Sequence, residues 1–176
     1  MAVAFIASAD LPPRPQAGAW MGRLVTEWLP DGRRFRLLEE FAFVGSSGEV
    51  WRALEGAAVD GSCFPSQFIR YIGHPFAGPQ RKAAVVYDIS CHEQKRGWRE
   101  TQRMFYEAAR LEGVRPVDAK VMYFALINFG PRWGSTLPRA ISTDEDFSRG
   151  ALYIRRHPEI SLPGIEQLSD AALRKR

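Results

Sequence analysis

The stretch VMYFALINF, residues 121–129, is apolar on every side of a helix and decides how the rest of this chain must be arranged. A helix that is hydrophobic all round is buried, so this segment is expected at the centre of the core. Pro116 suits the first turn of such a helix and Gly130-Pro131 ends it, which predicts a helix over residues 116–129. A chain of 176 residues has room for one domain around that core.

Two longer helices are expected before the central one, over residues 79–92 and 97–112. In the second, apolar and small side chains recur at helical spacing, and Gly113 stands where a C-terminal cap belongs. A shorter helix is expected over residues 66–72, inside a turn-rich segment. The pattern therefore predicts a three-helix core with one small helix beside it.

Apolar-rich runs separated by turn residues precede the helices and predict strands. The turns are Pro30-Asp31-Gly32 and the Gly45-Ser46-Ser47-Gly48 segment. The aromatic content favours strand, although the RFRLLEEFAF run could also form a helix. We expect an α+β fold in which a small antiparallel β-meander packs on the three helices, with strands near residues 23–29, 33–44 and 49–54.

The domain is assigned to residues 23–133. The segments on either side of it show less regular hydrophobic patterns than the domain itself. Residues 1–22 contain a segment rich in Pro, Ala and Gly and are expected to form an N-terminal arm. Residues 134–176 are expected to form an irregular C-terminal extension. Within it, LYIRRHPEISLPG predicts an extended piece, and residues 165–175 predict a short helix.

Charge and composition narrow the class of protein. The net charge is +4, from 24 basic and 20 acidic residues spread along the chain, so nucleic acid is not an expected partner. No run approaches the ~20 apolar residues of a membrane span. A secretory signal has a basic residue before its apolar stretch, and the N-terminus of this chain has none. We therefore expect a cytoplasmic protein without a cofactor or a bound metal.

The stretch AAVVYDISCHEQ, residues 83–94, places Asp88 in an apolar run, where an unpaired carboxylate is costly. Three interpretations remain open. Asp88 could bind a metal or act as a base, it could accept hydrogen bonds from the Asp60-Gly61 turn or a helix start, or it could face solvent. We favour the second, because carboxylates that accept backbone N–H bonds commonly hold a loop onto a helix.

The two cysteines, Cys63 and Cys91, form no CxxC motif, so they suggest no zinc knuckle. They could pair, or Cys63 could be a nucleophile with a nearby base. His92 follows Cys91 directly, and adjacent residues on a helix do not face each other. We favour two small buried thiols in a reducing cytoplasm.

Short motifs in a fixed order resemble an uncharacterised family common in phages and prophages, over about residues 35–133. That family has a D-G-A-S-V-P-like turn, a helix with H-D-Y-L-Y, a helix with A-D, and a helix ending M-Y-x-A-x-x-x-F-G. In this sequence the corresponding segments are Asp60-Gly61-Ser62-Cys63-Phe64-Pro65, Tyr87-Asp88-Ile89-Ser90-Cys91, Thr101-Gln102 and Met122 to Gly130.

This sequence departs from that family at the positions whose side chains would carry out catalysis. The resemblance implies a histidine where this chain has Tyr87, and an aspartate where it has Gln102. The family layout is also similar to that of secreted phospholipases A2, an analogy that does not by itself establish function. A phenol and an amide cannot replace an imidazole and a carboxylate as a proton shuttle near neutral pH. We expect a neutral hydrogen bond between Tyr87 and Gln102.

The resemblance and these losses together imply a non-catalytic protein with a degenerate hydrolase-like scaffold. It would bind another protein, such as a phage structural protein, in the cytoplasm of a bacterial host or in a virion or tail. The alternative is a lipid or cell-wall hydrolase with a rearranged site built from Asp60, Cys63, Asp88 and His92. An imidazole from elsewhere that reaches Asp88, or an ion bound there, would contradict the first expectation.

Overall fold

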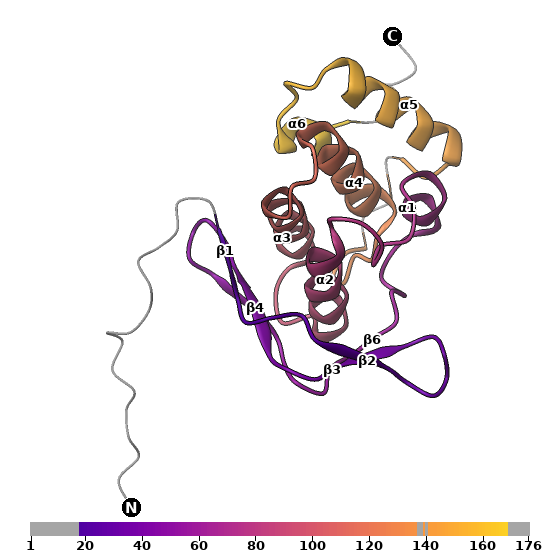
Figure 1. The fold of residues 1–176 in the computed structure, drawn as a ribbon. Helices are drawn as coiled ribbons and strands as arrows, with labels where there is room; N and C mark the ends of the chain where they lie inside the picture. Colours follow the sequence, from indigo (N-terminus) through magenta and orange to yellow (C-terminus); the bar gives the residue numbers. More distant parts are fainter. Residues whose placement is uncertain (1–17, 137–138, 140, 169–176) are drawn as a thin grey trace, which may run out of the picture.

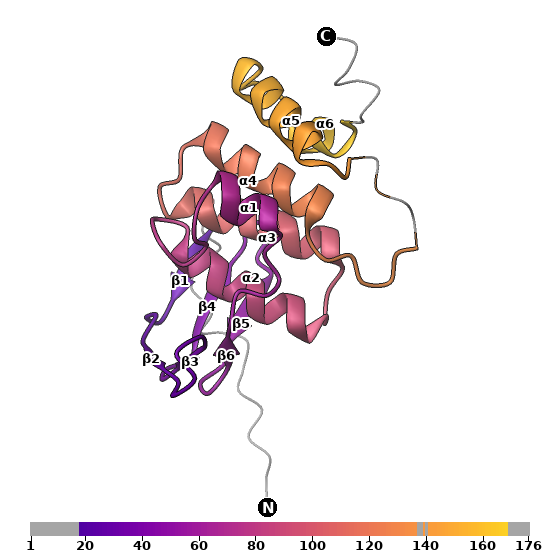
Figure 2. The same cartoon turned by 90° about the vertical axis from the view of Figure 1, so that its right-hand side faces the viewer.

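The computed structural model describes residues 18–136, 139 and 141–168, and it confirms the α+β class. Figures 1 and 2 show a layered arrangement in which the strands lie against one side of α2 and further helices stack beyond it. The last two helices, α5 and α6, lie at the end of the molecule opposite the strands. The segment around Asp88 therefore lies between the strand layer and the helical core.

The strand layer consists of two antiparallel three-stranded sheets, ordered β1-β4-β5 and β2-β3-β6. Apolar side chains on their inner faces, including Phe41, Phe43 and Val59, are buried against the helices. The strands are β1 (Ala19–Met21), β2 (Thr26–Trp28), β3 (Phe35–Leu37), β4 (Phe41–Val44), β5 (Val50–Ala53) and β6 (Ala58–Val59).

The predicted single meander is wrong in its connections. The run expected as one strand over residues 33–44 is interrupted after Leu37, so β3 and β4 belong to different sheets. β1 was not predicted at all, because it falls inside the segment assigned to the N-terminal arm, and Ala19 pairs with Val44 of β4. Residues 1–17 of that arm lie outside the described residues.

The helices follow the predicted pattern closely in the core. The three long core helices begin and end within about two residues of their predicted limits. Among the described residues, no helix combines the length and apolar character needed to cross a membrane. The helices are α1 (Ser66–Tyr71), α2 (Arg81–Glu93), α3 (Trp98–Leu111), α4 (Pro116–Phe129), α5 (Asp144–Arg156) and α6 (Leu162–Glu166).

The central position predicted for the apolar helix is confirmed. Phe124, Ala125 and Leu126 of α4 are fully buried. α3 packs on α4, and α1, α5 and α6 contact it as well. Pro116 occupies the first turn of α4, where its missing N–H costs nothing, and Gly113 (φ +88°) follows α3 in the left-handed region that favours glycine.

The C-terminal segment is more regular than predicted. The expected extended piece is wrong, because its first residues continue α5 as far as Arg156. A capping box starts this helix: the Thr143 side chain accepts from the Asp146 N–H, and the Asp146 side chain accepts from the Thr143 N–H. Phe147 and Ile154 bury its apolar face. Residues 169–176, most of the other predicted helix, lie outside the described residues.

Replacing Gly150 with alanine should destabilise the protein, because Gly150 lets α5 approach α4. A Cβ atom there would overlap the Phe124 ring. Overpacking of a buried contact typically costs about 1–3 kcal/mol, more than the helix propensity gained by Gly→Ala. Urea denaturation of Gly150→Ala measures this loss. Ser148→Ala, at an exposed position of the same helix, is the control; an equal effect of both changes would contradict the close α4–α5 contact.

Candidate functional site

Asp88 lies fully buried on α2. Its carboxylate accepts hydrogen bonds from the backbone of residues 60–63, called here the 60–63 turn. The N–H groups of Asp60 and Gly61 donate to Oδ2 at 3.2 and 3.1 Å. The N–H of Cys63 donates to Oδ1 at 3.2 Å. Of the three interpretations of Asp88, the one in which it accepts hydrogen bonds from this turn is confirmed, so its first role is to anchor the turn to α2.

The local sequence explains why this turn presents its N–H groups. Asp60 Oδ1 accepts from the Ser62 N–H at 2.8 Å, which closes a tight Asx-type turn. Gly61 adopts φ +74°, a conformation that other residues rarely tolerate. A Cβ atom at this position would also lie only 3.1 Å from the Phe76 ring. The Asp-Gly pair therefore aims the N–H groups of the turn at α2.

The two carboxyl groups of the site have opposite pKa shifts. Burial raises the pKa of Asp88, although the N–H donors of the 60–63 turn and the charge of His92 oppose the increase. Partial burial would also raise the pKa of Asp60, but hydrogen bonds from Ser62 and His92 bring it below its ordinary value. Asp60 is therefore the carboxylate that stays ionised at the surface.

His92 brings an imidazole to this carboxylate pair. Its Nε2 lies 3.2 Å from Ser62 Oγ, 3.5 Å from Asp60 Oδ1 and 3.9 Å from Asp88 Oδ2. His92 therefore lies near Asp88, but its Nε2 is beyond hydrogen-bond distance of the Asp88 carboxylate, so the imidazole makes no direct hydrogen bond there. The four residues of the alternative site, Asp60, Cys63, Asp88 and His92, are thus brought together, and the i,i+4 spacing of Asp88 and His92 on one helix is the local signal for their proximity.

The geometry around His92 differs from that of a Ser-His-Asp triad. In a triad the carboxylate holds Nδ1, so that Nε2 is free to take the proton of the serine. Here Ser62 and both carboxylates face the same nitrogen, Nε2. The His92 side chain is also about half-exposed, at 51%. The arrangement can hold a protonated imidazole or a cation, but it does not orient Ser62 as a nucleophile.

The two cysteines form a disulfide, which corrects the expectation of two free buried thiols. Cys63 of the turn and Cys91 of α2 are bonded, with their Cα atoms 6.5 Å apart. The 28-residue separation between them carries no sequence signal for pairing. While the bond is intact, Cys63 has no thiolate and cannot act as a nucleophile. The disulfide is a second link between the turn and α2, beside Asp88.

Tyr87 and Gln102 face the interior between α2 and α3, as predicted, and Gln102 acts on the Tyr87 hydroxyl as a hydrogen-bonding neighbour, although both side chains also contact backbone carbonyls. Tyr87 is fully buried between the rings of Phe64 and Phe105, at centroid distances of 5.0 and 5.6 Å. Its hydroxyl lies 3.5 Å from the carbonyl of Cys63. The Gln102 amide donates to the Leu126 carbonyl at 2.9 Å, and its Oε1 accepts from no group of the described residues.

The environment of Tyr87 makes its titration a test of this packing. Burial and the charge on Asp88 raise the pKa of Tyr87 well above its usual value, and nearby Gln102 works against that increase. A normal phenol titrates at about 10. Tyr87→Phe should therefore leave the ultraviolet phenolate signal unchanged at pH 10 to 11 while the protein stays folded. Loss of one tyrosine's share of the signal would show that Tyr87 is accessible.

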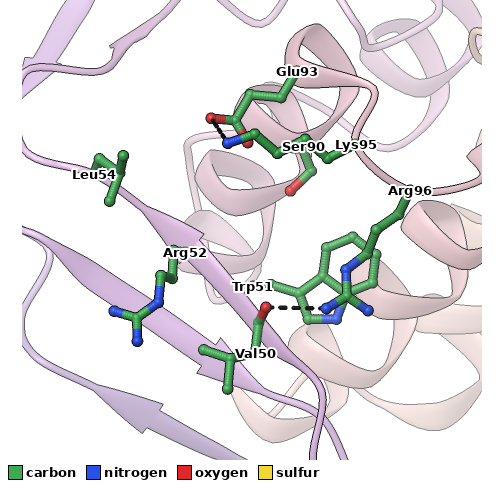
Figure 3. Close-up of a pocket in the computed structure, with 8 residues that line it drawn as sticks. All are labelled: Val50, Trp51, Arg52, Leu54, Ser90, Glu93, Lys95 and Arg96. Carbon is green, nitrogen blue, oxygen red and sulfur yellow. Dashed lines mark hydrogen bonds and ion pairs between the residues drawn. The ribbon is translucent and has the colours of Figure 1, made fainter. Parts of the chain in front are cut away.

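A separate pocket lies between β5 and the C-terminal end of α2 (Figure 3). Its volume, about 230 Å³, is below the range usual for small-molecule sites. Arg96 donates to the Val50 carbonyl at 3.3 Å and lies over the Trp51 ring, and Lys95 pairs with Glu93 at 3.0 Å. These cations are already engaged, and none of the predicted site residues lines the pocket.

Comparison with known proteins shows that the chain matches a family without an assigned activity. Residues 35–126 match the family described as "Protein of unknown function (DUF1353)". The chain is similar to two uncharacterised proteins of Sinorhizobium fredii, y4iH (32% identity over 111 residues) and y4jT (38% over 99 residues). The matches cover 62% and 56% of this chain but only 46% and 30% of those relatives. No solved structure matches the chain significantly.

Proposed function

The chain belongs to the DUF1353 family of proteins of unknown function, and we propose that it acts by binding another protein and not by catalysis. The observation that carries the proposal is the packing of Tyr87. At the position where the resemblance implies a histidine, this chain has a phenol sealed between Phe64 and Phe105. A group enclosed in this way cannot exchange protons with a substrate. Asp88, beside it, is committed to the backbone of the 60–63 turn.

The surface that best fits a protein partner is the β2 edge around Trp28. Trp28 is 70% exposed, the highest value among the large apolar side chains of the described residues that are classed as exposed. Among the described residues β2 pairs only with β3, which leaves its other edge available for further pairing. Exposed tryptophans are enriched at the centres of protein interfaces. The Trp28 ring rests edge-on against Phe35, which gives it a fixed position on the surface.

The biological setting that we propose is a prophage or phage in a bacterial host, with the protein in a virion or tail. The bacterial origin of the two curated relatives is consistent with such a host. The Cys63–Cys91 disulfide fits an extracellular particle better than the reducing cytoplasm, because disulfides persist mainly in oxidising surroundings. A partner in the assembled particle would then be another structural protein.

A photo-crosslinking residue at position 28 tests the binding proposal in the native host. Irradiation should yield one specific adduct, which mass spectrometry identifies as a particle protein. The matched control is the same residue at position 152 of α5, where Leu152 is also exposed, at 49%. Adducts that are absent at position 28, or equal at both positions, would contradict the proposal.

A second candidate, a lipid or cell-wall hydrolase, is favoured by the contacts of His92 with Asp60, Ser62 and Asp88. In it, His92 would act as a general base on water, since Cys63 is oxidised. The test is release of fatty acid from phospholipid vesicles and of muropeptides from peptidoglycan. Hydrolysis that His92→Ala abolishes and His157→Ala leaves unchanged would establish this candidate. Equal background rates for all three proteins would exclude it.

A further inference from the structure

We propose that reduction of the Cys63–Cys91 disulfide converts this site into a binding site for a zinc-type divalent cation, held by Cys63, Asp88 and His92. The cation would replace the disulfide as a link between the 60–63 turn and α2. The inference concerns the reduced protein, and it does not depend on the protein-binding function proposed above.

The ligand atoms are already gathered. One ligand atom each from Cys63, Asp88 and His92 lies within 4.8 Å of the other two. Cysteine sulfur, histidine nitrogen and carboxylate oxygen are all ligands that zinc accepts in tetrahedral sites. Two of the ligands are buried and His92 is exposed, which gives an ion a route from solvent. Only small side-chain movements are therefore needed to close the ligands around a cation.

Asp88 retains room for a cation despite its three hydrogen bonds. A carboxylate offers about four acceptor positions, and the N–H groups of the turn occupy three of them. Among the described residues Oδ1 accepts only from Cys63, so one of its lone pairs remains free, whereas Oδ2, which lies 3.9 Å from His92 Nε2, accepts from both Asp60 and Gly61. That atom lies next to Cys63, the residue whose thiolate would be the second ligand.

Charge balance favours a cation once the disulfide is open. A Cys63 thiolate beside the buried carboxylate of Asp88 would place two negative charges in an apolar region, which is costly without compensation. A divalent cation neutralises both. Asp60 Oδ1 and Ser62 Oγ lie 3.5 and 3.2 Å from His92 Nε2, so the fourth coordination position would face polar groups and water.

The redox step requires a dithiol reductant. The dithiol gives two electrons and two protons to the disulfide, which yields the Cys63 and Cys91 thiols and the oxidised cyclic disulfide of the reductant. Binding of the cation then releases the proton of Cys63 to solvent. Cys91 is not a member of the ligand group, so the proposal assigns it only the role of masking Cys63 in the oxidised protein.

Two single variants separate this proposal from a general effect of losing the disulfide. Cys91→Ser and Cys63→Ser both remove the bond, but only Cys91→Ser leaves the Cys63 thiol. Under anaerobic conditions, Cys91→Ser should bind one Co²⁺ per chain, with thiolate-to-cobalt charge-transfer absorption, and Zn²⁺ should displace it. Cys63→Ser should show neither. Adding His92→Ala to Cys91→Ser should weaken Zn²⁺ binding at least tenfold, whereas adding His157→Ala should not change it.

The unmodified protein provides a second measurement if the variants fold poorly. By isothermal titration calorimetry, the oxidised protein should bind no Zn²⁺ at this site. After reduction by a dithiol and removal of the reductant, it should bind one equivalent. Equal binding by the oxidised and reduced proteins would overturn the proposal, as would equal binding by Cys63→Ser and Cys91→Ser or failure of the reduced protein to bind.

Discussion

Asp88→Ala should lower the free energy of unfolding by about 2–3 kcal/mol, among the largest effects expected of a single change in this protein. The substitution leaves three backbone N–H groups, those of Asp60, Gly61 and Cys63, without their acceptor. Cys63 is buried, and a buried donor left unsatisfied costs about 1–3 kcal/mol, whereas Asp60 is exposed and Gly61 half-buried, so water can partly replace their acceptor. Equilibrium denaturation in urea, with the disulfide intact, measures the loss.

Asp31→Ala is the matched control for that measurement. Asp31 also accepts two backbone N–H bonds within its own turn, from Arg33 and Arg34, but it lies at the exposed surface. Water can replace its hydrogen bonds, so we expect a much smaller loss. If Asp88→Ala proved no more destabilising than Asp31→Ala, Asp88 would not anchor the turn.

Removal of the disulfide should have the other large effect. The bond closes a loop with a sequence separation of 28 residues. In the chain-entropy account, a loop of this length is worth about 3–4 kcal/mol. For a protein of this size that corresponds to a decrease in Tm of about 10 °C. Calorimetry of the double variant Cys63→Ala/Cys91→Ala in the presence of a chelator measures the change without interference from metal ions.

Reduction of the unmodified protein is the control for the double variant. With a chelator present, the reduced protein should melt within a few degrees of the double variant, because both lack the same covalent link. A reduced protein as stable as the oxidised one would mean that the link between turn and helix is held by other contacts. The Asp88 hydrogen bonds, with the contacts of Ser62 to His92 and of Tyr87 to the Cys63 carbonyl, would then hold the turn.

The parts of the fold that could be predicted depend on strong local patterns. The all-apolar helix α4 was identified because no surface helix tolerates such a composition. The turn at Asp60-Gly61 was identified because only a few residue types adopt its geometry. β1, by contrast, is three residues long and is defined by its pairing with β4, which leaves no periodic signal of its own. α5 was missed because Gly150 interrupts its pattern, although the capping box at Thr143 marked its start.

The site shows the same division between local and long-range information. The role of Asp88 as a hydrogen-bond acceptor could be predicted because an unpaired carboxylate in an apolar run is energetically costly, and the local sequence shows that run. The pairing of Cys63 with Cys91 depends on how the turn docks on α2, and no spacing rule contains that. The contact of His92 with Asp88 was available from the i,i+4 spacing.

One physical claim is central: the carboxylate of Asp88 holds the 60–63 turn on α2 by accepting hydrogen bonds from its backbone N–H groups. Amide hydrogen exchange by NMR, in the unmodified protein and in Asp88→Asn, tests it most directly, with amides of α4 as the reference for global stability. Asparagine keeps one accepting oxygen where the carboxylate has two, so we predict that at least one of the Gly61 and Cys63 amides exchanges at least about tenfold faster in the variant, a loss of about 1.4 kcal/mol of local protection, relative to α4. Unchanged exchange of both amides relative to α4 would contradict the account.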